Sequence, residues 1–182
     1  MSLKKPKYTS FRDIPPFTRS ASYKICLPLP RASIWLNEMR KDYGLNILPD
    51  FQRGRVWTDE QQIAYIVFLL RGGRTGRDLF FNKPSWDTNV PEGDYDEFVC
   101  VDGLQRLTAM CRFVNNEIPA FGSYFEEYTD LRLFNRIVAQ VHINDLKTER
   151  EVLQWYLDIN DGGTPHTSDE IERVRKLLEQ CR

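Results

Sequence analysis

Histidine and cysteine are scarce in this chain of 182 residues, which contains two histidines and four cysteines. The cysteines show no C-x-x-C spacing, which disfavours a structural zinc site, and two of them, Cys100 and Cys111, occupy apolar positions expected of buried thiols. His142 and His166 cannot build an HNH-type histidine cluster, and no H-E-x-x-H pattern is present. We therefore expect no metal site built from protein side chains alone, and we expect each histidine to be a structural or surface residue.

Long apolar runs and a large net charge are also missing. No apolar stretch approaches the roughly 20 residues of a membrane-spanning helix, and the start of the chain lacks the apolar core of a secretion signal. These absences predict a cytoplasmic protein without membrane contact. The net charge is −1, and the hydrophobic and charged fractions of 41% and 28% are ordinary for a single globular domain.

The near-zero net charge hides a strong asymmetry. Residues 1–31 carry seven basic side chains and one acidic side chain, so this part has a charge of +6 and residues 32–182 have −7. Pro15-Pro16, Pro28 and Pro30 are expected to break up regular structure there. We interpret residues 1–31 as a basic arm that contacts DNA or RNA phosphates or pairs with the acidic surface of its own domain.

Hydrophobic periodicity predicts helices and strands in a mixed order along the remaining chain. The predicted elements are a helix over Ile34–Asp42, a helix after Thr58 that is capped with Gln61, strands at Asp78–Asn82 and Arg136–Ile143, and a helix after Thr148 that is capped with Glu151. A final amphipathic helix, within 168–182, begins near Thr167 and Glu170. Its apolar stripe predicts packing on the domain or a homodimer contact; the stripe consists of Ile171, Val174, Leu177 and Leu178.

The segment with the strongest chemical signal joins a short strand to a helix through Asp102-Gly103. The strand covers Phe98–Val101, and the helix places Gln105 and Arg106 in its first turn. Unpaired backbone N–H groups and the helix dipole attract anions at such a place, and a guanidinium matches phosphate oxygens. The alternative is structural: Asp102 and Gln105 form a capping box, Gly103 permits the turn, and Arg106 is a solvated charge.

A second polar segment precedes the Thr58 helix. It contains Gln52, Arg53 and Arg55 between the aromatic residues Phe51 and Trp57. An arginine next to a glutamine thus occurs twice, each time near a helix entrance, which predicts that Arg53 and Arg106 converge on one pocket. The alternative is that Arg53 and Arg55 form ordinary ion pairs with surface carboxylates.

Three boxes in order along the chain resemble the GmrSD-type N-terminal domain family, also called domain of unknown function 262. They are Pro49-x-Phe51-Gln52-Arg53-x-x-x-Trp57, Val101-Asp102-Gly103-x-Gln105-Arg106-Leu107-Thr108, and Ile159-Asn160-Asp161-Gly162-Gly163-Thr164-Pro165. The resemblance implies a compact α+β, or mixed α/β, fold related to ParB and sulfiredoxin. Such a domain has a small mixed sheet, flanking helices and a helical last third, and we assign it to residues 32–167.

The resemblance also implies a nucleotide or phosphate site at the family's Asp-Gly-Gln-Gln-Arg box. Carried over to this chain, the catalytic residues are Asp102, Gln105 and Arg106. The phosphates would be held by Arg106 and Arg53, a water would be oriented by Gln105 or Gln52, and Asp102 would hold a divalent metal or an arginine. The ligand-binding residues are Gln52, Arg53, Arg55 and Gly103.

Members of the family are associated with nucleoside-triphosphate hydrolysis coupled to nucleic-acid cleavage in restriction and phage defence. The implied ligand here is a nucleoside triphosphate with Mg²⁺. Two departures favour a second reading. Leu104 replaces the first glutamine of the box, and the chain ends at Arg182 where the restriction enzymes continue into a nuclease domain. The alternative function is therefore a non-catalytic module that binds nucleotide or nucleic acid as a regulator.

Overall fold

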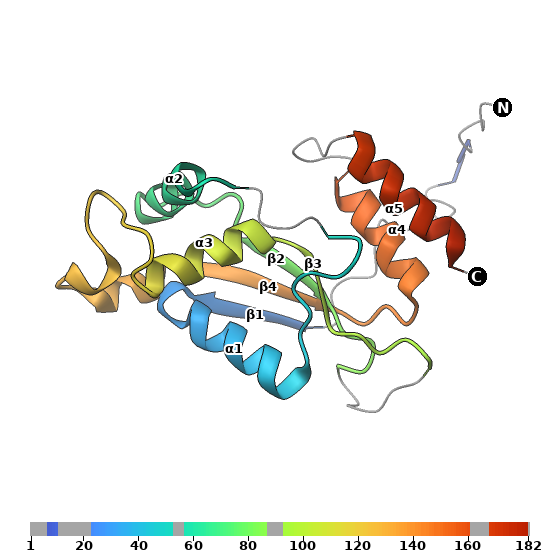
Figure 1. Ribbon diagram of the computed structural model, residues 1–182, viewed down its shortest axis with the longest axis horizontal. Helices are drawn as coiled ribbons and strands as arrows, with labels where there is room; N and C mark the ends of the chain where they lie inside the picture. The colour runs from blue at the N-terminus through green and yellow to red at the C-terminus, as the bar shows by residue number, and fades with distance from the viewer. Residues whose placement is uncertain (1–6, 11–22, 53–56, 87–92, 161–167, 182) are drawn as a thin grey trace.

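The computed structural model describes residues 7–10, 23–52, 57–86, 93–160 and 168–181. Its elements, in chain order, are β1 (Tyr23–Pro28), η2 (Leu29–Arg31), α1 (Ala32–Tyr43), α2 (Asp59–Leu70), β2 (Asp78–Asn82), β3 (Val99–Asp102), α3 (Leu104–Val114), η3 (Phe125–Glu127), η4 (Leu131–Arg136), β4 (Val138–Asn144), α4 (Glu149–Asn160) and α5 (Ser168–Gln180). Helices and strands are interspersed along the chain, and the fold is the expected mixture of α and β structure (Figure 1). None of the helices in these ranges is long and apolar enough to cross a membrane.

One four-stranded mixed sheet organises the described part of the chain, with the strand order β1-β4-β2-β3. The pair β1 and β4 is antiparallel, β4 and β2 are parallel, and β2 and β3 are antiparallel. The ladder between β2 and β3 is irregular between Phe80 and Phe81, where the register shifts. Because β3 lies at one edge and ends at Asp102, the predicted site lies at the edge of the sheet.

The larger of two hydrophobic cores lies between one face of the sheet and helices α1, α2 and α3 (Figure 1). In β4 the alternation expected from the sequence is confirmed, because Ala139, Val141 and Ile143 are buried in this core. Helix α3 is the central element, since it packs against both α1 and α2 and buries Leu104, Leu107 and Cys111. This packing holds the start of α3 firmly on the sheet.

A second, smaller core joins the opposite side of β3 to helices α4 and α5. Val99 and Val101 face this core, whereas Cys100 between them faces the larger one. The apolar stripe of α5 packs here, with Val174 fully buried and Leu177 and Leu178 partly buried. Packing on the domain is therefore confirmed for these positions, and the homodimer stays a prediction.

Local capping signals were accurate predictors of helix ends. Thr58 and Gln61 form the predicted reciprocal capping box of α2, and α1 ends at Gly44, which adopts a left-handed conformation. At α4, the hydroxyl and the backbone N–H of Thr148 both lie within hydrogen-bond distance of the Glu151 carboxylate. The final helix is also confirmed from Ser168 onward, while Thr167 lies outside the described residues.

The expectation that the prolines break up residues 1–31 was wrong for Tyr23–Pro28. This segment is the edge strand β1, paired with β4 along its whole length from Tyr23 to Pro28. Proline is tolerated at the end of an edge strand, because it breaks little of the ladder there. Burial of Leu27 and Leu29 in the larger core favours the strand over an unattached arm.

Candidate functional site

The strand, turn and helix of the second box, residues 101–108, are present as predicted. The residue that caps the helix is not the predicted one. Strand β3 ends at Asp102, Gly103 is the N-cap residue, and α3 begins at Leu104. Glycine has no side chain to cap the helix, and Asp102 is not the N-cap residue, so the interpretation of Asp102 and Gln105 as a capping box was wrong. Gln105 and Arg106 do lie in the first turn, beside the N–H groups that a capping side chain would otherwise cover.

Gly103 has a structural reason to be glycine. Its φ of 103° lies in the left-handed region, and a Cβ atom there would lie 2.6 Å from Leu79 Cδ2 and 3.2 Å from Leu79 Cα. The main chain therefore passes close to β2 at the point where the helix starts. Whether Gly103 also lets a phosphate approach the backbone stays a prediction.

Asp102 is ion-paired with Arg106, one helical turn further along the chain. Their side chains are only 31% and 19% exposed, respectively, so Arg106 is not the freely solvated surface charge of the alternative reading. A guanidinium carries five N–H donors, and one carboxylate oxygen engages only part of them. Asp102 therefore orients Arg106 while leaving it chemically able to bind an anion.

Two glutamines attach the first box, residues 49–57, to the second box, residues 101–108. Gln52 Nε2 donates to the carbonyl oxygens of Cys100 and Val101, at 3.4 and 3.2 Å. The backbone N–H of Trp57 in turn donates to Gln105 Oε1 at 3.3 Å. Both ends of the segment that carries Arg53 and Arg55 are thus bound to the β3–α3 unit. These two arginines lie outside the described residues, so their predicted convergence with Arg106 stays a prediction.

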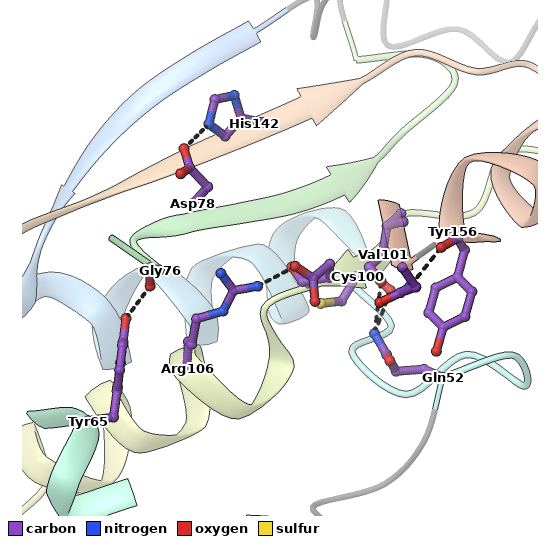
Figure 2. A network of polar contacts seen from close by, with 11 residues as sticks. Gln52, Tyr65, Gly76, Asp78, Cys100, Val101, Arg106, His142 and Tyr156 are labelled. Atoms are coloured by element: carbon purple, nitrogen blue, oxygen red, sulfur yellow. Dashed lines mark hydrogen bonds and ion pairs between the residues drawn. The ribbon is translucent and has the colours of Figure 1, made fainter. Parts of the chain in front are cut away.

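The third box approaches the same strand from α4. Tyr156 packs its ring edge-on against Phe51 with the ring centroids 5.3 Å apart, and Asn160 Nδ2 donates to Tyr156 O at 2.7 Å. Figure 2 shows Gln52 and Tyr156 side by side next to Val101. Residues 161–167 lie outside the described part of the chain. The first two boxes and helix α4, which leads into the third box, therefore meet around β3.

Leu104, the residue that departs from the family's box, lies in the larger core with 3% of its surface exposed. Its side chain points away from the polar groups of the site, as the helical pattern predicted. The polar side chains that the end of β3 and the first turn of α3 themselves supply are those of Asp102, Gln105 and Arg106. Leucine in place of the family's glutamine at position 104 therefore leaves these three side chains in place.

Two residues near Arg106 were missed by the sequence analysis, Tyr65 on α2 and Arg77 just before β2. The Tyr65 hydroxyl donates to Gly76 O at 2.8 Å, and Figure 2 shows the Arg106 side chain next to this pair. Burial raises the pKa of Tyr65 to about 12, and the nearby charges of Arg106 and Arg77 act against this rise. An arginine directly before a predicted strand was the available signal, but sequence alone did not show that this strand neighbours α3.

His142, considered above as a structural residue, lies on the other face of the sheet from Arg106 (Figure 2). Its Nε2 is 2.7 Å from Asp78 Oδ1, and its ring stacks on Phe80 with the centroids 4.8 Å apart. These contacts explain the residue without a role in the candidate site. Among the described residues, no group of three or more His, Cys, Asp or Glu side chains is placed to hold a metal ion.

Comparison with known proteins agrees with the order of the boxes. No curated protein and no solved structure matches the chain significantly. One family model does match, described as the GmrSD restriction endonuclease, N-terminal domain, and it covers residues 35–176. The match includes all three boxes, the whole of α4 and the first part of α5. The chain therefore belongs to the GmrSD restriction endonuclease N-terminal domain family.

Proposed function

We propose that this protein binds and hydrolyses a nucleoside triphosphate at the start of α3, as part of a restriction or phage-defence system. The observation that carries the proposal is the contact between the first two boxes at one helix start, where glycine is the N-cap residue and an ion-paired Arg106 lies beside it. Family membership relates the chain to restriction. Phosphoryl transfer relies mainly on positioning and charge neutralisation, and this arrangement supplies both.

The phosphates would be bound by backbone N–H groups of the first turn of α3 together with Arg106. Arg53 and Arg55 lie one and three residues after Gln52 in the sequence, so we assign them to the same ligand. Asp102 is the carboxylate at the site that could take one position on Mg²⁺, which commonly binds one or two carboxylates plus phosphate oxygens and waters. Its contact with Arg106 would then place metal and guanidinium on one phosphate chain.

The two glutamines have different roles in this proposal. Gln52 donates to two carbonyl oxygens of β3, so it anchors the segment that carries Arg53. Gln105 lies in the first turn of α3 and receives the N–H of Trp57, which fixes its amide next to the expected phosphates. We therefore assign the orientation of the attacking water to Gln105.

Phosphate release from a panel of nucleoside triphosphates, with and without Mg²⁺, tests the proposal. We expect Mg²⁺-dependent release by the wild type and loss of release in Arg106→Ala. Arg112→Ala is the matched control, because Arg112 lies on the same helix but pairs with Asp59 and Glu117 away from the site. Nucleotide binding without release, or a gel shift of DNA or RNA without nucleotide binding, would instead identify the non-catalytic regulatory module.

Asp102→Asn tests whether Asp102 acts on the ligand site. We expect Mg²⁺-dependent nucleotide binding to weaken at least tenfold, because the orienting charge on Arg106 and the carboxylate for the metal are both lost. The free energy of unfolding should change by less than about 1 kcal/mol, since partly exposed ion pairs contribute little. Calorimetric titration and thermal melting measure the two quantities, and unchanged nucleotide affinity would show that Asp102 is not part of the site.

A further inference from the structure

Arg77 lies beside the start of α3, although it belongs to none of the three boxes. The pairing of β2 with β4 continues to this residue, because Gln140 N donates to Arg77 O at 2.9 Å. Side chains two apart in extended chain share one face of a sheet, so Arg77 shares its face with Leu79. Leu79 is the residue that Gly103 packs against. This alternation directs Arg77 toward the first turn of α3 rather than toward the opposite face.

Arg77 has no charge partner in the described part of the chain. Its Nε atom is buried and makes no hydrogen bond there. The neighbouring acid, Asp78, points to the opposite face of the sheet, where it contacts His142. Arg106 and Arg112, by contrast, are each paired with a carboxylate. Leaving a buried guanidinium nitrogen unpaired costs free energy, and a ligand bound to Arg77 would remove that cost.

Tyr65 connects Arg77 to Arg106. Its hydroxyl is hydrogen-bonded to the carbonyl of Gly76, the residue directly before Arg77. The guanidinium charges of Arg77 and Arg106 both act to lower the pKa of this same hydroxyl against the effect of burial. Two positive charges therefore act on the Tyr65 hydroxyl, while the carboxylate of Asp78 acts in the opposite direction (Figure 2 shows Arg106 and Tyr65). Asp102 is paired with Arg106 alone.

We propose that Arg77 is a second phosphate-binding arginine of the α3 site, and that the site consequently selects a chain of two or more phosphoryl groups over a single phosphate. This inference rests on the proposed function and adds the residue that reads phosphate-chain length. Arg106 and the helix start hold one phosphoryl group. Arg77, reaching the site from β2, holds the next, because a guanidinium binds phosphate oxygens through two parallel hydrogen bonds.

Calorimetric titration with inorganic phosphate, pyrophosphate and tripolyphosphate tests this inference without a nucleotide. We expect the wild type to bind tripolyphosphate at least tenfold more tightly than phosphate. Arg77→Gln should reduce the preference for tripolyphosphate over phosphate roughly tenfold, which is the effect expected from losing one charged hydrogen-bonded contact. It should change the affinity for phosphate by less than about threefold. Arg74→Gln is the matched control, because Arg74 is an exposed arginine three residues away in the same loop.

The possible outcomes separate this inference from the proposed function. Wild-type preference that survives in Arg77→Gln overturns the inference and leaves the proposed function standing. No binding of any of the three anions by the wild type overturns both. Equal wild-type affinity for phosphate and tripolyphosphate overturns the inference alone.

A measurement on the wild type covers the case in which Arg77→Gln does not fold. Phenylglyoxal modifies arginines, and mass spectrometry of peptides gives the rate at each position. We expect tripolyphosphate to slow modification of Arg77 and Arg106 and to leave Arg74 unchanged. An unchanged rate at Arg77, with Arg106 protected, would overturn the inference.

Discussion

Gly103→Ala is expected to lower the free energy of unfolding by about 2–5 kcal/mol, the largest stability effect predicted for the site. A left-handed conformation costs a non-glycine residue about 1–2 kcal/mol. The new Cβ atom would also lie 2.6 Å from Leu79 Cδ2 and 3.2 Å from Leu79 Cα. Overpacking of this kind costs typically about 1–3 kcal/mol, because β2 and α3 must move apart. Denaturation in urea measures the change.

Gly72→Ala separates the two contributions. Gly72 also has a positive φ, 87°, but a Cβ atom there would meet nothing within 4 Å. We therefore expect this variant to lose only the conformational part, about 1–2 kcal/mol. Equal losses in the two variants would show that the contact between Gly103 and β2 does not matter for stability.

Arg106→Lys is expected to weaken nucleotide binding by about 1.5–3 kcal/mol, the usual contribution of a hydrogen bond to a charged group. Lysine keeps the charge but cannot reproduce the planar pair of donors that a guanidinium offers to phosphate. It also cannot hold the same geometry against Asp102. Stability should change little, because the side chain is partly exposed and its ion pair contributes little. Calorimetric titration with the best-binding nucleotide gives the affinity.

Arg112→Lys controls for the general effect of replacing an arginine on α3. Arg112 donates to Asp59, Gln62 and Glu117, at the other end of the helix from the site. We expect its nucleotide affinity to match the wild type. A large loss of thermal stability in Arg106→Lys, or an affinity equal to that of the wild type, would instead make Arg106 a structural residue.

Prediction from sequence worked best where the determining interactions are local. Thr58 and Gln61 are three residues apart and satisfy each other's backbone, so their capping box was readable without any tertiary contact. The alternation of Val138–Asn144 likewise follows from the period of a strand. The two errors arose where a distant contact outweighed a local preference. Asp102 pairs with Phe80 as the last residue of β3, so Gly103 became the cap of α3, and Tyr23–Pro28 formed a strand because β4 lies beside it.

The sequence by itself determined the order of the helices and strands after residue 31, the three boxes and the position of Arg106 in a first helical turn, because each depends on residues close together in the chain. Tertiary structure alone decided which elements meet at that turn. The pairing of β2 with β3 and β4 places Leu79 against Gly103 and directs Arg77 toward α3. Strand register and helix packing depend on residues far apart in the chain, so no local pattern in the sequence contained this part of the site.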